Sequence, residues 1–176
     1  MGHVLRPEGL KLSTEIVTAA LDMPPPQDKA ASHWFLGTTT YLAKFSPNLS
    51  KVVRPLHNLT HLKQEFLWFE QHSNAFTEAK ELVSKAPCLH YFDINAPVLL
   101  QVDVSEYGLG AALLQPAIDP TGSNNIQWQP VIYSTSSLSP TEQLYAQIER
   151  EILAIVHTFH KFNQLLFGTS EITVHS

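Results

Sequence analysis

One aspartate, Asp103, stands inside an otherwise apolar run, Leu99 to Gln115, written LLQVDVSEYGLGAALLQ. Side-chain alternation over the strand predicted at 98–104 places Asp103 on the face opposite the valines of that strand. Because the run is almost continuously apolar, we expect both faces to be partly covered, so an ionised carboxylate needs a cation or another partner. The ordinary alternative is an aspartate at the end of a strand that caps the following turn.

A second carboxylate, Glu151, belongs to one long helix predicted from Pro140 to about Phe167. At about 100° per residue, Glu151 falls within the apolar stripe of this helix, which we expect to face the sheet. Glu149 points the other way and has the position of a solvated charge. The stripe consists of Leu144, Ile148, Ile152, Ile155, Phe159 and Phe162.

Two inward carboxylates on facing elements are typical of a site for a hard divalent cation. Oxygen ligands suit Mg²⁺, and two-metal phosphoryl chemistry places such groups around ions about 4 Å apart. We therefore expect Asp103 and Glu151 to lie close together as metal ligands.

The elements that must position these residues form an α+β protein in which the character of the chain changes at Pro97. The remainder is predicted as three antiparallel strands, the long helix and a last strand, at 98–104, 109–115, 130–135, 140–167 and 172–175. The first ninety residues are predicted to be mostly helical. Their expected elements are a hairpin around Pro7 to Gly9, helices at 15–21, 28–45 and 49–62, a short strand FLWF, and a helix ended by Pro87.

Three parts follow from this pattern. Residues 1–27 form a hairpin, a short helix and a spacer of three prolines, 28–95 form a helical region, and 96–176 carry the sheet. The chain has 176 residues, 44% of them hydrophobic, which is enough to bury a core. A single cysteine, Cys88, permits no internal disulfide, and no apolar run approaches the roughly 20 residues that span a bilayer. We expect an intracellular protein, cytoplasmic or nuclear and not secreted, without a membrane partner.

The net charge of −5 argues against nucleic-acid binding through a generally basic surface, because Lys and Arg supply most of such affinity. Lys44, Lys51 and Arg54 either contact phosphate locally or are simply solvated. The neighbouring aromatic side chains are better explained as core than as a base-stacking platform, because their spacing is helical. They are Trp34, Phe35, Tyr41 and Phe45.

Two histidine pairs, His57 with His61 and His157 with His160, have spacings that a metal would tolerate. No further cysteine, histidine or carboxylate is obviously paired with either one. Surface or half-buried side chains are therefore the favoured interpretation, and a zinc site is the alternative.

The order of the motifs is itself informative. FLGTTTYLAKFSPNLS, PLHNLT, FLWFEQHSNAFTEAKELVSKAP, QVDVSEYGLGAALLQ and PVIYSTSSLSPTEQLYAQIEREILAIV follow one another over nearly the whole chain. In this order and spacing they closely resemble the Pol polyprotein of gypsy-type LTR retrotransposons. The resemblance implies that 1–27 belong to the edge of the palm of the reverse transcriptase, that 28–95 are a region like its thumb and connection, and that 96–176 are an incomplete ribonuclease H-like domain.

The resemblance implies roles for two residues. Asp103 matches the first catalytic aspartate of the ribonuclease H fold, and Glu151 matches the catalytic glutamate of its first helix. In the family such residues hold Mg²⁺ ions that activate water against the RNA strand of an RNA–DNA hybrid. The implied partners are that hybrid and the remainder of Pol, and the oligomeric state stays open.

The departures from the family pattern weigh against catalysis by this chain alone. The third carboxylate of the family follows the strand ITVHS, which here ends at Ser176, and the fourth lies further on. The polymerase YxDD motif is absent. We therefore expect an inactive fragment of a ribonuclease H-type endonuclease. The alternative is a non-catalytic structural or interaction module derived from a domesticated Pol fragment.

Overall fold

The computed structural model describes residues 3–46, 48–61, 65–106, 108–117 and 127–176. The chain divides into two compact units, which we call the helical unit and the sheet unit. The helical unit consists of Met1–Leu5 with Lys11–Pro87, and the sheet unit of Arg6–Leu10 with Cys88–Ser176.

The chain begins with the predicted hairpin and continues into helices whose starts are encoded locally. The Ser13 hydroxyl accepts a hydrogen bond from the Ile16 N–H, and the Asp28 carboxylate accepts one from the Ala31 N–H at 2.7 Å. The elements are β1 (His3–Arg6), β2 (Gly9–Leu12), α1 (Thr14–Asp22), α2 (Lys29–Leu42), η1 (Ala43–Phe45), α3 (Leu49–Val52), α4 (Arg54–Leu59) and α5 (Glu70–Ser84).

The core of the helical unit is made by α2, α3, α4 and α5. The Phe35 and Phe76 rings pack with their centroids 4.8 Å apart. The apolar side chains buried here are Phe35, Leu36, Leu42, Phe45, Leu49, Val53, Leu56, Leu59, Ala75, Phe76, Ala79 and Val83. This packing accounts for the helical period of the sequence.

Two predictions for this region are wrong. The helix expected at 49–62 is divided into α3 and α4, because Pro55 lies in the first turn of α4 and has no N–H with which to continue the preceding helix. The segment FLWF is not a strand. Leu67 and Phe69 are exposed there, and no strand pairs with it among the described residues. Trp68 instead packs against the rings of α5, with its centroid 5.7 Å from that of His72.

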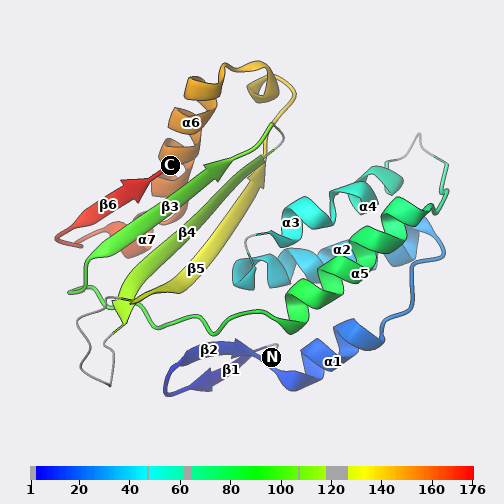
Figure 1. The fold of residues 1–176 in the computed structure, drawn as a ribbon, viewed down its shortest axis with the longest axis horizontal. Helices are drawn as coiled ribbons and strands as arrows, with labels where there is room; N and C mark the ends of the chain where they lie inside the picture. The colour runs from blue at the N-terminus through cyan, green and yellow to red at the C-terminus, as the bar shows by residue number, and fades with distance from the viewer. Residues whose placement is uncertain (1–2, 47, 62–64, 107, 118–126) are drawn as a thin grey trace. The chain divides into compact units, whose positions relative to one another are not determined.

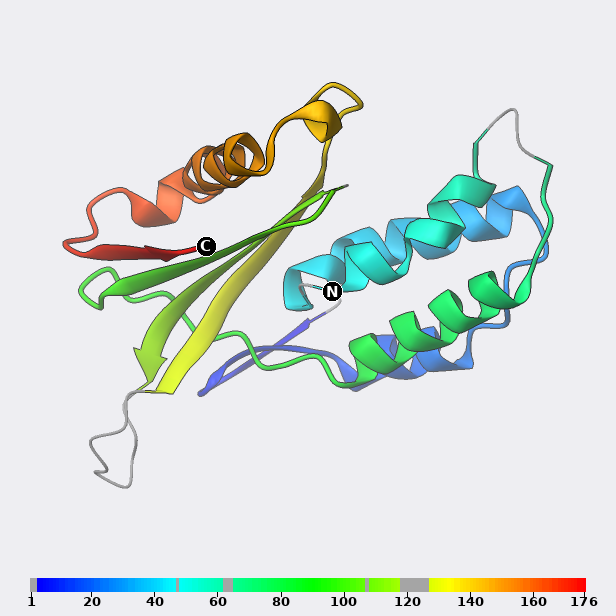
Figure 2. The same ribbon diagram turned by 45° about the horizontal axis from the view of Figure 1, so that its top comes forward.

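The sheet unit contains a four-stranded mixed sheet in the order β5-β4-β3-β6 (Figure 1). Strands β3, β4 and β5 are antiparallel neighbours, and β6 runs parallel to β3. Helices α6 and α7 lie over one face of the sheet (Figure 2). The bounds are β3 (Val98–Val104), β4 (Gly108–Ala117), β5 (Gln127–Ser137), η2 (Glu142–Leu144), α6 (Gln147–Lys161), α7 (Asn163–Leu166) and β6 (Ile172–His175).

The long helix expected at 140–167 is wrong in its extent. Tyr145 and Ala146 are extended and separate η2 from α6, and α6 gives way to α7 at Phe162. The Glu149 carboxylate accepts a hydrogen bond from the Ala146 N–H at 2.8 Å, which fixes the start of α6. Glu149 is therefore a helix cap as well as a solvated charge.

The orientation expected for α6 is also wrong. The helix rests on the sheet through Ala154 and Thr158, both buried, whereas Ile148 and Ile152 are exposed. Small side chains at the contact let the helix backbone approach the strands closely, and they do not stand out in a hydrophobic pattern. Most of the apolar stripe consequently faces away from the sheet.

The α+β fold class is nevertheless confirmed, with a mixed sheet and helices as predicted. No helix in the described parts of the chain combines the length and apolar character needed to cross a membrane.

Candidate functional site

Asp103 is exposed and lies near the end of β3, opposite Gly110 of β4. It shares its face of the strand with Leu99 and Gln101, as alternation predicts. The following turn is held by Ser105, whose hydroxyl accepts a hydrogen bond from the Gly108 N–H at 3.1 Å. Asp103 is therefore not the residue that caps this turn.

Glu151 lies in the second turn of α6 and is half-buried on the side that faces the sheet. Its Oε1 accepts a hydrogen bond from the Gln147 Nε2 at 3.0 Å, one helical turn earlier. The inward position predicted for Glu151 is present, although the surrounding apolar stripe is not buried with it.

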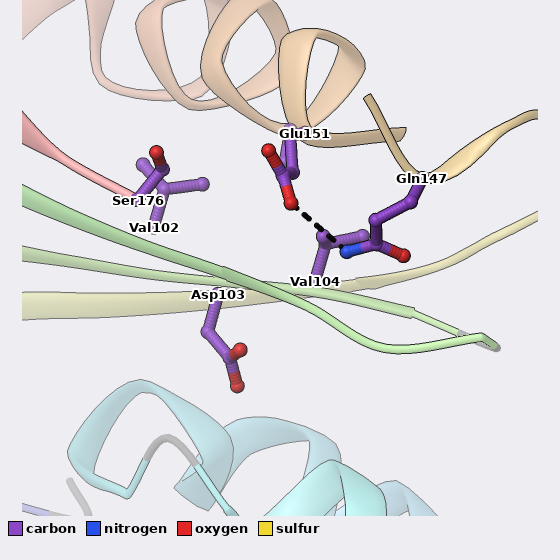
Figure 3. Close-up of a pocket in the computed structure, with 7 residues that line it drawn as sticks. Val102, Asp103, Val104, Gln147, Glu151 and Ser176 are labelled. Carbon is purple, nitrogen blue, oxygen red and sulfur yellow. Dashed lines mark hydrogen bonds between the residues drawn. The ribbon is translucent and has the colours of Figure 1, made fainter. Parts of the chain in front are cut away.

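The two carboxylates border one small pocket, but Glu151 points from α6 toward β3 whereas Asp103 points away from α6. Figure 3 shows Glu151 on the α6 side of β3, above Val102 and Val104, and the Asp103 side chain on the other side of the strand. The expectation that both lie in one interior is therefore wrong. The physical reason is the strand period of two: α6 packs on the valine face, and Asp103 is one residue out of phase with that face.

The residues of this pocket do not fit a pair of magnesium ions. Two-metal chemistry requires several carboxylates converging around neighbouring ions. Over the described residues, no cluster of three or more histidine, cysteine, aspartate or glutamate side chains is arranged to hold a metal. Glu151 instead has a neutral amide for a partner.

Two further residues of the pocket, Gln147 and Ser176, were not found by the sequence reasoning. Gln147 lies four residues before Glu151 on the helix. Polar pairs at this spacing are common on exposed helices, so the pair did not mark a site in the sequence. Ser176 reaches the pocket because β6 runs parallel to β3, which brings the carboxyl ends of both strands to the same edge.

A different surface appears on α2. Trp34 is 65% exposed and Tyr41 37% exposed, and Gly37 lies between them on the same side of the helix. A methyl group added at Gly37 would meet no atom within 4 Å. We call Trp34, Gly37, Tyr41 and Lys44 the α2 face.

The polar ends of this face are held in place. The Lys44 Nζ lies 4.0 Å from the centroid of the Tyr41 ring, and the Tyr41 hydroxyl is 2.8 Å from the His3 Nδ1. At the other end, Trp34 borders an open groove lined by Ala31 and residues 23–28, which include the three prolines.

Only half of the predicted aromatic core is buried: Phe35 and Phe45 are inside, whereas Trp34 and Tyr41 are not.

Three histidines, His33, His57 and His61, lie near one another in the helical unit. Burial, with the nearby charges of His33 and His61, lowers the pKa of His57. The Lys29 ammonium donates to the His61 carbonyl at 2.8 Å. Among the described residues, these histidines are not part of any group of three or more histidine, cysteine, aspartate or glutamate side chains that could hold a metal ion.

Charge is divided unequally along the chain. Residues 88–176 contain only Arg150 and Lys161 as lysine or arginine, against eight aspartate and glutamate residues. The other nine basic residues all lie in 1–87. Contacts to a polyanion are therefore favoured by the first half of the chain and opposed by the second.

Comparison with known proteins agrees with this fold. Residues 68–174 match the family described as "RNase H-like domain found in reverse transcriptase". Among curated relatives, the retrovirus-related Pol polyprotein from transposon opus of Drosophila melanogaster is 30% identical over all of this chain and 18% of its own length. The transposon Tf2-3 polyprotein of Schizosaccharomyces pombe is 27% identical over 97% of this chain and 12% of its own length.

Solved structures show the same fold. A foamy viral protease-reverse transcriptase in complex with double-stranded DNA has a TM-score of 0.80 and 20% identity, over 99% of this chain and 29% of that one. The same kind of protein in complex with an RNA/DNA hybrid has a TM-score of 0.80 and 19% identity, over 99% and 23%. This chain thus spans less than a fifth of the curated relatives named above. The resemblance to retrotransposon Pol is confirmed, and the chain belongs to the family of RNase H-like domains found in reverse transcriptases.

Proposed function

We propose that this chain is a duplex-binding part of a retrotransposon Pol polyprotein, that it holds an RNA–DNA hybrid through the α2 face, and that it does not cleave the hybrid by itself. The observation that carries the proposal is the exposed Trp34, Gly37 and Tyr41 surface in the half of the chain that contains nearly all the basic residues.

The α2 face has the properties that a duplex requires. Exposed aromatic side chains offer flat contact area to sugars and base edges, and Lys44 adds a positive charge at one end. Gly37 has no internal packing partner, so its missing side chain is best explained by the close approach of another molecule. Solved relatives of similar fold are described in complex with double-stranded DNA and with an RNA/DNA hybrid.

Hydrolysis is proposed only for the longer polyprotein. There, Asp103 and Glu151 correspond to two of the ligands that the resemblance assigns to Mg²⁺. In this chain they lie on opposite sides of β3, and no third carboxylate joins them among the described residues. We derive no catalytic step from this arrangement.

Binding to a fluorescein-labelled RNA–DNA hybrid, followed by fluorescence anisotropy at low salt, tests the binding proposal. Trp34→Ala and Tyr41→Ala should each raise the dissociation constant at least about fivefold, since an aromatic contact to a nucleic acid contributes roughly 1 kcal/mol or more. Leu67→Ala removes a similarly exposed apolar side chain elsewhere in the helical unit and should have no effect. Equal affinities for all three variants and the parent chain would overturn the proposal.

A cleavage assay on the same hybrid, with Mg²⁺ or Mn²⁺, tests the proposal that this chain alone does not cleave the RNA strand. The expected result is intact RNA with the parent chain. Cleavage that is abolished by Asp103→Asn would show that this chain is an active nuclease and that its carboxylates come together on the substrate.

A further inference from the structure

Basic side chains from two packed helices gather in the helical unit. Helix α2 packs against α4, and the charge of His33 on α2 acts on His57 of α4, as does that of His61, which follows α4. The Lys29 ammonium lies at the same place, because it donates to the His61 carbonyl at 2.8 Å. Arg54 lies one turn before His57 on α4. We call Lys29, His33, Arg54, His57 and His61 the α2–α4 cluster.

We propose that the α2–α4 cluster is a phosphate site, which binds the backbone of an RNA–DNA hybrid and at which His57 gains a proton on binding. This inference rests on the proposed function. It adds to that function a second contact group on the ligand, the phosphodiester anion, and a dependence of affinity on pH.

The cluster adjoins the α2 face on the helix itself. His33 precedes Gly37 by four residues, so the two positions lie one above the other on the same side of α2. The side chains of His33, His57 and His61 are all exposed. A duplex carries a phosphate charge about every 1.7 Å along its axis, so a duplex that approaches Gly37 closely brings its backbone to these imidazoles.

The charges that act on His57 are positive. Burial is the largest cause that lowers the pKa of His57, and the charges of His33 and His61 lower it further. Of the other elements packed against α4, α3 adds Lys51. The carboxylates of α5 are exposed and lie on the side of that helix opposite its buried residues; they are Glu70, Glu78 and Glu81.

The carboxylate at the start of α2 has a structural role. Asp28 accepts a hydrogen bond from the Ala31 N–H at 2.7 Å and caps the helix. An anion that would stabilise the protonated imidazole of His57 is therefore best supplied by a ligand.

A bound phosphate reverses the effect of the surrounding positive charges. A phosphodiester accepts hydrogen bonds from a protonated imidazole, and these charge-assisted bonds are stronger than neutral ones. The bound anion therefore raises the pKa of His57 above its value in the free chain, and binding takes up a proton. Affinity for the hybrid consequently rises as the pH falls through about 6.5.

Fluorescence anisotropy of the labelled hybrid at constant ionic strength measures this linkage between about pH 8 and about pH 6. Over that range the affinity of the parent chain should rise at least about threefold more than that of His57→Gln, since one linked proton changes affinity by up to about tenfold per pH unit. His160→Gln removes an exposed imidazole of the sheet unit and should keep the pH dependence of the parent. Trp34→Ala should weaken binding by the same factor at every pH.

The outcomes separate this proposal from duplex binding as such. Equal pH dependence in the parent and in His57→Gln, with weaker binding by Trp34→Ala, would overturn the phosphate site and leave binding through the α2 face intact. A loss of pH dependence in His160→Gln as large as that in His57→Gln would also overturn the phosphate site. A parent chain that binds no hybrid at any pH would overturn both proposals.

Proton NMR of the His57 imidazole provides a second readout and identifies the source of the phosphate. Its titration midpoint should move to higher pH on adding the hybrid. Movement with inorganic pyrophosphate alone, and none with the hybrid, would show a site for free anions and overturn the proposal. A midpoint that moves with neither ligand would overturn it as well.

Discussion

Asp103 and Glu151 border the same pocket from opposite sides of β3. The strand itself separates the two carboxylates that the family resemblance assigns to one metal site. Their separation follows from the position of α6, which covers the face of β3 that carries Val102.

Magnesium should therefore not stabilise this chain. A ligand that binds only the folded state raises the free energy of unfolding, and two separated carboxylates offer no site of useful affinity. We expect Mg²⁺ to have no larger effect on the urea midpoint of the parent chain than on that of a variant with Asp103→Asn and Glu151→Gln. A shift confined to the parent would show that the carboxylates converge on the ion.

Gly37→Ala should separate stability from binding. Alanine in a helix interior is more favourable than glycine by about 0.5–1 kcal/mol, and the added methyl group meets no protein atom. We expect a higher urea midpoint together with weaker binding to the RNA–DNA hybrid. Unchanged binding would mean that nothing approaches the α2 face closely.

Gly9→Ala should have the opposite effect on stability. Gly9 has a φ of 143°, which disfavours other residues, and an added methyl group would collide with the Leu89 carbonyl oxygen. That carbonyl accepts a hydrogen bond from the Leu10 N–H at 2.6 Å, so it cannot easily move away. We expect a loss of about 2 kcal/mol or more in the free energy of unfolding, measured by urea titration. A loss as small as that of an ordinary surface substitution would contradict the geometry.

The stability of the chain should fall in mild acid, in part through His72. Burial lowers the pKa of His72, and its Nδ1 accepts a hydrogen bond from the Phe69 N–H at 2.9 Å, which requires the neutral ring. The unfolded chain therefore binds a proton more readily than the folded one as the pH falls through about 6.5, so the free energy of unfolding decreases there.

Urea unfolding above and below that pH measures the effect. His72→Gln keeps an acceptor for the Phe69 N–H and removes the titration, so the variant should lose less stability than the parent on acidification. An identical loss in both chains would assign the pH dependence to other groups, among them His57.

The sequence predicted much of the local structure, because the signals are local. The hairpin at Pro7 to Gly9 and the strand at 98–104 depend on neighbouring residues and appear where they are expected. Where a helix was misjudged, as at Pro55, the cause was one backbone donor whose absence breaks the ladder of hydrogen bonds.

Alternation along β3 already placed Asp103 opposite the valines, and the helical period already put Glu151 on the far side from Glu149. Only the tertiary structure decided which face of the sheet α6 covers and which side of α6 is buried. Hydrophobicity alone favours Ile148 and Ile152 as the contact, yet the sheet receives Ala154 and Thr158, because small side chains allow the closest approach of helix and strand. That choice between faces separates the carboxylates and leaves the isoleucines exposed, and it depends on packing between distant segments that no local pattern contains.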